Sequence, residues 1–249
     1  MTEYNILGVK VNVIAEHILK NKLLEFLNSD KAHQIATVNP EFIISSQKNK
    51  KFLDSINQSS ISLIDGTGVI KALQYMGHKV SLDDRITGVQ LAQILIDKAV
   101  NRDLKILFCL YSKGMTKADK FFMSIKSKYP SLDFQVADEN TALEKAKLFA
   151  PEIILVGFGA PRQDIWISEH LNQIPNVKIA AGVGGTFDFM PGKIKRAPKF
   201  ARSFGLEWLW RLLIQPNRLL RINKAVIQFS WLIYKDKRKN KKTHAKNKN

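Results

Sequence analysis

Short apolar runs alternate with amphipathic segments through the first 190 residues of this 249-residue chain, and this alternation limits the fold more than any other feature. Several of the runs are apolar throughout, as is typical of parallel strands that helices cover on both faces. The pattern therefore predicts an α/β fold with an open, doubly wound, mostly parallel sheet of the Rossmann-like type. We expect strands at residues 33–39, 60–65, 104–110, 132–138, 152–158 and 177–183, and helices at 15–28, 88–101, 116–129, 141–150 and 161–174.

The C-terminal quarter has a different character from the rest of the chain. Residues 199–249 hold 14 Lys and Arg against 2 Asp and Glu, whereas the first 198 residues hold 25 against 20. Two helices rich in Trp and Leu are expected there, at 199–215 and 216–234, with a break at Pro216. We therefore divide the chain into three parts, an α/β domain at 1–198, a basic amphipathic membrane-docking appendage at 199–234 and a disordered basic tail at 235–249.

This uneven charge points to an anionic partner at one end of the molecule, either nucleic acid or an anionic membrane surface. The basic residues lie beside a broad apolar stripe, whereas a groove for a nucleic-acid strand would alternate basic and aromatic residues. We therefore favour the membrane and expect no nucleic-acid partner; a nucleic-acid-binding protein is the alternative from another functional class. The sequence has neither a signal-peptide pattern nor an apolar run of about 18 residues, so a cytoplasmic location is expected.

Candidate functional residues are sought at the carboxyl ends of the strands, where open α/β sheets bind ligands. Thr37 and Asn39 lie on one face at the end of the first expected strand. Asp65 ends the second strand and is followed by Gly66, Thr67 and Gly68. Asn39 and Asp65 could each also be an ordinary helix cap, and taken singly that interpretation is at least as good.

Two glycine-rich segments follow later strands. Gly157 and Gly159 precede a helix that starts near Pro161, an arrangement that suits a phosphate. Gly184, Gly185 and Asp188 follow the last strand, where the acid could accept hydrogen bonds from a ribose or a base. Arg162 occupies the third position of a dinucleotide fingerprint and no P-loop is present, which argues against an oxidoreductase and a P-loop NTPase.

No cofactor is expected. The five histidines are scattered without ligand spacing, and one cysteine, Cys109, lies in an apolar run that predicts a buried core thiol. No Asp-x-Asp sequence is present to hold a catalytic metal. The sequence therefore predicts a metal-independent reaction.

Five segments occur in an order that resembles a known family: TVNPEF, DGTGVI, RITGVQL, VGFGAPRQDIWI and GVGGTFDFMPGKIKRAP. From about residue 5 to about residue 225 the chain is similar to the WecG/TagA/CpsF glycosyltransferases, and it departs from them at Asp164, where relatives often have Glu. The resemblance implies an inverting transfer of N-acetylmannosamine from UDP-N-acetylmannosamine to undecaprenyl-diphosphate-linked N-acetylglucosamine, as in the TagA branch that makes the linkage unit of wall teichoic acid. A relative that uses another UDP-sugar, such as UDP-N-acetylmannosaminuronic acid or a UDP-hexose, for a capsule or other surface polysaccharide is the alternative.

The residues and the resemblance together assign roles. Asp65 is the candidate base because it is the one isolated acid at a glycine-bounded strand end. By resemblance, Thr37 and Asn39 shape the same pocket. Arginines can replace a metal in stabilising a departing diphosphate, and Arg211, Arg218 and Arg221 match the family's C-terminal arginines, with contact to lipid headgroups as the other reading. The candidate nucleotide-sugar residues are Gly157, Gly159, Pro161, Gln163, Gly184, Gly185 and Asp188.

The expected partners follow from these roles. They are a UDP-sugar donor, a polyprenyl-diphosphate-linked N-acetylglucosamine acceptor and an anionic membrane surface, which places the protein peripherally on the inner face of a bacterial cell membrane. The sequence leaves open whether the chain also forms a homo-oligomer.

Overall fold

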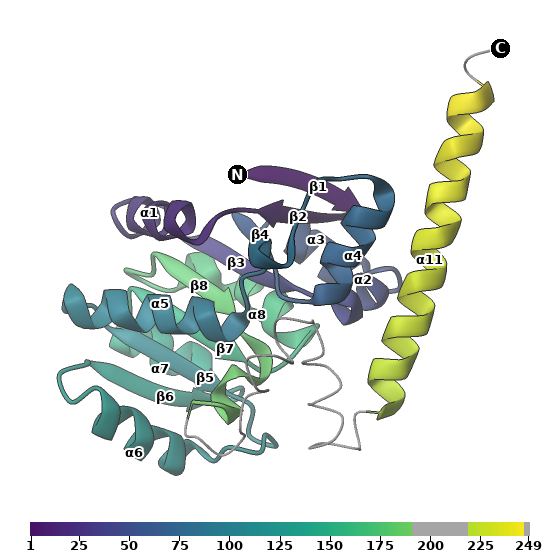
Figure 1. Cartoon of the computed structure of the whole chain (residues 1–249). Coiled ribbons are helices and arrows are strands. Elements are labelled where there is room, and N and C mark those ends of the chain that lie inside the picture. Colours follow the sequence, from purple (N-terminus) through teal and green to yellow (C-terminus); the bar gives the residue numbers. More distant parts are fainter. Residues whose placement is uncertain (191–218, 247–249) are drawn as a thin grey trace.

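The computed structural model describes residues 1–190 and 219–246, with the side chains of the last segment described from 226 to 239. Eight strands form one sheet in the order β1-β2-β4-β3-β8-β7-β5-β6 (Figure 1). The first two strands pair antiparallel, and every other pairing is parallel. The strands are β1 (Thr2–Ile6), β2 (Val9–Val13), β3 (His33–Val38), β4 (Ile61–Ile64), β5 (Ile106–Leu110), β6 (Phe134–Asp138), β7 (Ile153–Gly157) and β8 (Ile179–Gly182).

Helices cover both faces of the sheet, which confirms the predicted α/β, Rossmann-like class. On one face the core holds residues of α1 (Glu16–Leu27), α5 (Gly88–Asn101) and α6 (Ala118–Lys128). The other face is packed by α2 (Pro40–Ser46), α3 (Lys50–Asn57), α4 (Thr67–Met76), α7 (Ala142–Phe149) and α8 (Arg162–His170). Three 3-10 turns, η1 (Leu82–Asp84), η2 (Leu171–Gln173) and η3 (Gly184–Asp188), complete the described part of this domain.

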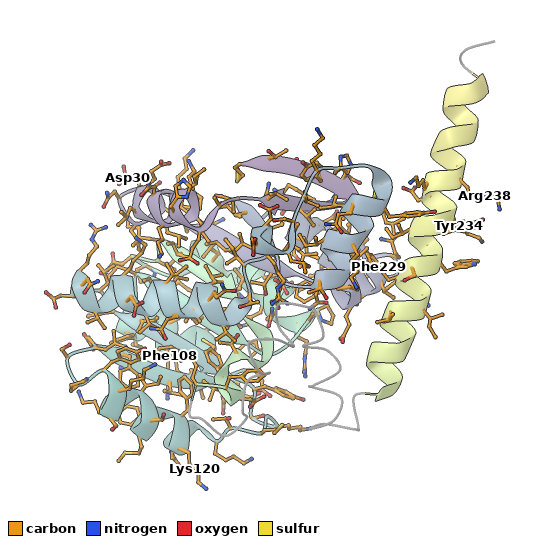
Figure 2. All side chains as sticks on the ribbon, in the orientation of Figure 1. Asp30, Phe108, Lys120, Phe229, Tyr234 and Arg238 are labelled. Carbon is orange, nitrogen blue, oxygen red and sulfur yellow. The ribbon has the colours of Figure 1, made fainter. Side chains whose placement is uncertain are left out.

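The interior is apolar and tightly packed. Phe108 on β5 is fully buried within the sheet domain (Figure 2). Its ring packs edge-on against Phe121 and Phe187. Cys109, the next residue, faces the other side of the sheet and is also fully buried, as predicted. Burial raises the pKa of its thiol, because the thiolate would lose its hydration. Cys109 is therefore a core residue.

All six predicted strands and all five predicted helices of the first 190 residues are present. Among the elements outside those ranges, two had no sequence signal. The first is the β1–β2 hairpin, whose turn places Leu7 and Gly8 at φ 52° and 84°. Asn5 supports this turn by accepting a hydrogen bond from the Gly8 amide at 2.9 Å. The second is α3, whose Phe52 and Ile56 are fully buried.

The C-terminal segment differs from its prediction. A single helix, α11 (Leu219–Lys246), continues through residues 235–246, where a disordered tail was expected, and its end projects beyond the sheet domain (Figure 1). Two features account for the difference. Lys, Arg and Ala have good helix propensity, and the packed first half of α11 supplies the nucleus from which a helix can extend. The helix predicted at 199–215 lies outside the described residues, as does the break at Pro216.

Phe229 and Ile233 attach α11 to the sheet domain. Both are 4% exposed and belong to the core cluster that includes Phe42 of α2 and Val69 of α4. Figure 2 shows Phe229 on the side of α11 that faces the domain. Among the helices that the structure describes, none is long and apolar enough to cross a membrane.

Candidate functional site

A small cleft opens at the carboxyl edge of the sheet, where four parallel strands end. We call it the Asp65 cleft; its volume is about 160 Å³. Turns after β3, β4, β7 and β8 form its walls, together with the N-terminus of α5. Among the residues that line it are Thr37, Asn39, Asp65, Thr87, Gly88, Val89, Gly159, Gln163, Gly184 and Gly185.

Asp65 lies directly after β4 and is half-buried. Its backbone amide donates a hydrogen bond to the Val38 carbonyl oxygen at 2.9 Å, which extends the pairing of β3 and β4 by one residue. Asp65 was considered as the N-cap of α4, but Gly66 occupies that position and Asp65 precedes it. The strand therefore sets Asp65 at the mouth of the sheet, as the predicted role as base requires.

Thr37 and Asn39 hold neighbouring backbone in place. The Thr37 hydroxyl donates to the Gly182 carbonyl oxygen at 2.7 Å, which joins the ends of β3 and β8. The Asn39 side chain accepts from the Phe42 amide at 3.2 Å and caps α2, so the ordinary capping role is present. Both residues also line the cleft, and they can shape it while making these bonds.

Gln163 joins the two glycine turns, which follow β7 and β8 and contain Gly159 and Gly184. Its side chain is fully buried, and its oxygen accepts hydrogen bonds from the amides of Gly159 at 3.2 Å and Gly184 at 3.0 Å. Gly182 is needed beside it, because a Cβ there would lie 2.6 Å from the Gln163 side-chain nitrogen and 2.8 Å from Asp164 Oδ1. One amide side chain thus fixes the spacing of the two turns.

Asp164 is buried behind these turns. It has no exposed surface, and neither carboxyl oxygen has a hydrogen-bond partner among the described residues. Burial raises the pKa of this carboxyl from 3.8 to about 7, because the ionised form would lose its hydration. Below pH 7 this carboxyl is mostly protonated, and in that form it places no negative charge near an anionic ligand.

A second hollow adjoins the first, and we call it the Asp188 cleft. Its volume is about 280 Å³, and it shares Gly159, Ala160, Gly184 and Gly185 with the Asp65 cleft. The Arg162 guanidinium lies over the Tyr111 ring, 4.1 Å from its centroid. Thr116 donates a hydrogen bond to Asp188 Oδ1 at 3.0 Å, which orients that carboxyl. An aromatic ring, a fixed carboxyl and two cations, Arg162 and Lys113, therefore surround the space.

The structure brings together most of the predicted site residues that it describes. Thr37, Asn39, Asp65, Gly159, Gln163, Gly184 and Gly185 line the Asp65 cleft, and Gly157, Gly159, Gly184, Gly185 and Asp188 line the Asp188 cleft. Pro161 lines neither and instead occupies the N-cap position of α8. Arg211 and Arg218 lie outside the described residues, and Arg221 is in α11 at a position whose side chain is not described.

Several lining residues were not predicted. Tyr111 follows β5 directly, so the rule applied to the other strand ends would have found it. Thr87 caps α5 through a capping box with Gln90, and its segment is one of the five that carry the family resemblance. Arg162 lies in another of the five segments, although it was used only to argue against a dinucleotide fingerprint. Lys113 gave no signal, since single basic residues in turns are common.

Among the described residues, no group of three or more His, Cys, Asp or Glu side chains could hold a metal ion. Metal independence stays a prediction, to be tested on the protein itself.

Comparison with known proteins decides the family. A sequence model described as "Glycosyl transferase WecG/TagA/CpsF family" matches residues 4–243. The chain belongs to the WecG/TagA/CpsF family. It is therefore a glycosyltransferase, as the resemblance predicted.

Curated relatives of this WecG/TagA/CpsF protein carry a more specific name. Proteins of Staphylococcus aureus strains NCTC 8325 / PS 47 and MRSA252 are 33% identical over 214 residues, which cover 84% of this chain and 82% of theirs. Both are named N-acetylglucosaminyldiphosphoundecaprenol N-acetyl-beta-D-mannosaminyltransferase. The matched length is enough to include both clefts and part of the basic C-terminal region.

Proposed function

We propose that the protein transfers N-acetylmannosamine from UDP-N-acetylmannosamine to N-acetylglucosamine linked to undecaprenyl diphosphate. The observation that carries the proposal is the junction of the two clefts at the Gly159 and Gly184 turns, one cleft lined by the Asp65 carboxylate and the other suited to a nucleotide. The names of the curated relatives supply the sugar and the acceptor.

The donor occupies both clefts in this proposal. The uridine lies in the Asp188 cleft, where Asp188 can accept hydrogen bonds from ribose hydroxyls and Tyr111 offers an aromatic face. The diphosphate lies at the shared glycine turns, near Lys113 and Arg162. The uncharged sugar then extends into the Asp65 cleft, beside Thr87 and Gly88 at the N-terminus of α5.

Transfer requires one proton acceptor and stabilisation of one leaving group. Asp65 takes the proton from the acceptor hydroxyl as that oxygen forms a bond to the anomeric carbon of N-acetylmannosamine. The bond between that carbon and the diphosphate oxygen breaks with inversion, and UDP departs with the electron pair. Cations near the diphosphate stabilise the charge that develops there, and Arg211, Arg218 and Arg221 are proposed to add to them.

A donor screen tests this proposal. The purified full-length chain is incubated with lipid-linked N-acetylglucosamine and, in separate reactions, UDP-N-acetylmannosamine, UDP-N-acetylmannosaminuronic acid, UDP-glucose and UDP-N-acetylglucosamine. We expect a disaccharide product by mass spectrometry with UDP-N-acetylmannosamine alone. Product with another donor would replace the proposed sugar, and no product with any donor would reject the proposed acceptor.

We also propose that α11 holds the protein on the inner face of the cell membrane. Its outward side exposes Ile227 at 65% and Trp231 at 53%, and the Lys235 ammonium lies 3.5 Å from the centroid of the Trp231 ring. Residues 235–249 carry eight Lys or Arg against one Asp. Exposed apolar side chains beside basic ones suit the interface of an anionic bilayer, where each basic residue contributes roughly 1 kcal/mol.

Vesicle binding measures this attachment. The double variant Ile227→Ser/Trp231→Ser and a chain ending at residue 234 should each bind phosphatidylglycerol vesicles at least tenfold more weakly in sedimentation assays. The matched control is Phe122→Ser/Met123→Ser, which removes two exposed apolar side chains from α6. Equal losses in the α11 and α6 variants would contradict a specific role for α11.

A further inference from the structure

A third cavity separates α11 from the sheet domain, and we call it the α4–α11 groove. Its volume is about 540 Å³, within the range of small-molecule binding sites. Pro40, Gly68 and Ala72 lie on the side of the sheet domain, and Phe229, Ser230 and Ile233 lie on α11. The groove is therefore largely apolar, although Phe229 and Ile233 are buried by other contacts.

The groove lies directly behind the Asp65 cleft. Pro40 follows Asn39 in sequence and Thr67 follows Asp65 by two residues, so the turns that line the cleft continue into the wall of the groove. These turns are in close contact with each other. A Cβ on Gly66 would lie 2.6 Å from Pro40 Cδ, and one on Gly68 would lie 2.7 Å from Pro40 Cγ. These close-packed turns form the partition between the polar cleft and the apolar groove.

Cations lie at the edge of the groove. Lys71 is exposed and lines it. The Lys237 ammonium lies 4.0 Å from the centroid of the Tyr75 ring and donates a hydrogen bond to the Tyr75 carbonyl oxygen. Lys71 lies one helical turn after Thr67, towards the end of α4 that follows Asp65, whereas Lys237 lies near the other end of α4. An apolar channel with an ammonium group towards the end nearest a candidate catalytic carboxylate suits an apolar chain that carries an anionic group at that end.

We propose that the α4–α11 groove holds the first isoprene units of the lipid-linked acceptor, those next to its diphosphate. This inference rests on the proposed function, because it takes the acceptor from there. The diphosphate then lies at the outer edge of the turns that separate the groove from the cleft, and the N-acetylglucosamine hydroxyl reaches past that edge to Asp65. The chain leaves along α11, whose exposed Val226 and Tyr234 line the groove and adjoin the outward apolar side.

Filling the groove tests the proposal. Ser230 is exposed and lies one helical turn from Val226 on the same side of α11. Ser230→Trp places an indole in the groove, and Val226→Trp does so from the preceding turn. Ser127→Trp is the matched control, since Ser127 is exposed on α6, which lies far from α11 (Figure 1).

The first readout needs no catalysis. Titration calorimetry with geranylgeranyl diphosphate should show saturable binding to the full-length chain and to Ser127→Trp. Binding should be at least tenfold weaker in Ser230→Trp and Val226→Trp, whose folding is checked by thermal melting. Inorganic diphosphate should bind much more weakly than the isoprenoid compound, since each buried CH₂ adds about fourfold in affinity. No saturable binding to the unchanged chain, or unchanged binding to both groove variants, would overturn the proposal.

The second readout compares a long acceptor, whose isoprenoid chain can fill the groove, with a short one in which a methyl group replaces that chain. In the groove variants, the ratio of kcat/KM for the long acceptor to that for the short one should fall about tenfold. If kcat/KM falls by the same factor with both acceptors, the substitutions do not act on recognition of the isoprenoid chain, and the proposed role of the groove is wrong. If the unchanged protein acts on neither acceptor yet binds geranylgeranyl diphosphate, the proposed function fails and the groove stands.

Discussion

The Asp65 cleft and the α4–α11 groove lie on either side of one partition but are formed by different parts of the chain. The cleft is made of backbone at strand ends, held by buried side chains such as Thr37 and Gln163. The groove is made of side chains from two helices and depends on where α11 packs. Under the two proposals, the sheet fixes the residues that carry out the chemistry, while recognition of the lipid depends on where α11 packs.

The largest expected effect lies in the cleft. Asp65→Asn removes the proposed base while keeping the shape of the side chain, so kcat should fall about 10²–10⁴-fold. Binding of UDP, measured by calorimetry, should change less than twofold. Asp119→Asn, at an exposed position on α6, is the matched control. Activity within a few-fold of the unchanged protein would mean that Asp65 is not the base. The proposal that the cleft carries out the chemistry while the groove binds the lipid would then be wrong.

A smaller effect is expected at the point that joins the two glycine turns. Gln163→Ala leaves the Gly159 and Gly184 amides without their acceptor and opens a cavity, so the free energy of unfolding should fall by about 2–3 kcal/mol. The KM for the UDP-sugar should rise roughly tenfold, because the turns would no longer be held at their spacing. Gln173→Ala removes an exposed amide instead. Similar melting temperatures for the two variants would argue against the fastening role.

Asp164 should affect stability in a pH-dependent manner. Below pH 3.8 both states keep its proton, and between pH 3.8 and about 7 the unfolded chain releases the proton while the folded chain retains it. Over that window this carboxyl makes the folded state progressively less stable, by a few kcal/mol in total, and above it the effect is constant. Urea unfolding of the unchanged protein and of Asp164→Asn should therefore give curves that separate between pH 4 and 7.

The surface variant Asp133→Asn is the control for that series. Parallel curves for the unchanged protein and Asp164→Asn would mean that the buried carboxyl is ionised in the folded protein.

The smallest expected effect is that of a chelator. If side chains and backbone alone stabilise the departing diphosphate, transfer should continue in EDTA at nearly the original rate. Loss of activity in EDTA, with recovery on adding Mg²⁺ or Mn²⁺, would mean that the cleft depends on a metal that its residues do not suggest.

The sequence predicted the strand ends well, since their geometry is local. A parallel strand that stops at Val38 or Ile64 must deliver the next residues to one edge, so Asn39 and Asp65 could be placed together before the structure was known. The β1–β2 hairpin was missed because its turn, Leu7–Gly8, lacks the usual Asn-Gly or Asp-Gly pair. The buried state of Asp164 depends on three elements meeting, which no local pattern reports.

The course of α11 was the other miss. The charge density of residues 235–249 alone predicted disorder. The helix, however, is anchored by the contacts of Phe229 and Ile233, which precede the basic run, and it continues from there through residue 246. The α4–α11 groove could not have been predicted for the same reason, because its two walls are more than 150 residues apart in sequence.

The buried state of Cys109 makes the chain convenient for site-directed labelling. It is the only cysteine in the sequence, it is fully enclosed in β5, and its thiol is held protonated. Thiol reagents should therefore leave the native protein unmodified. A cysteine introduced at Trp231 or Lys239 would then carry the only reporter, and its fluorescence or spin signal could measure the depth of each turn of α11 in a bilayer without first constructing a cysteine-free background.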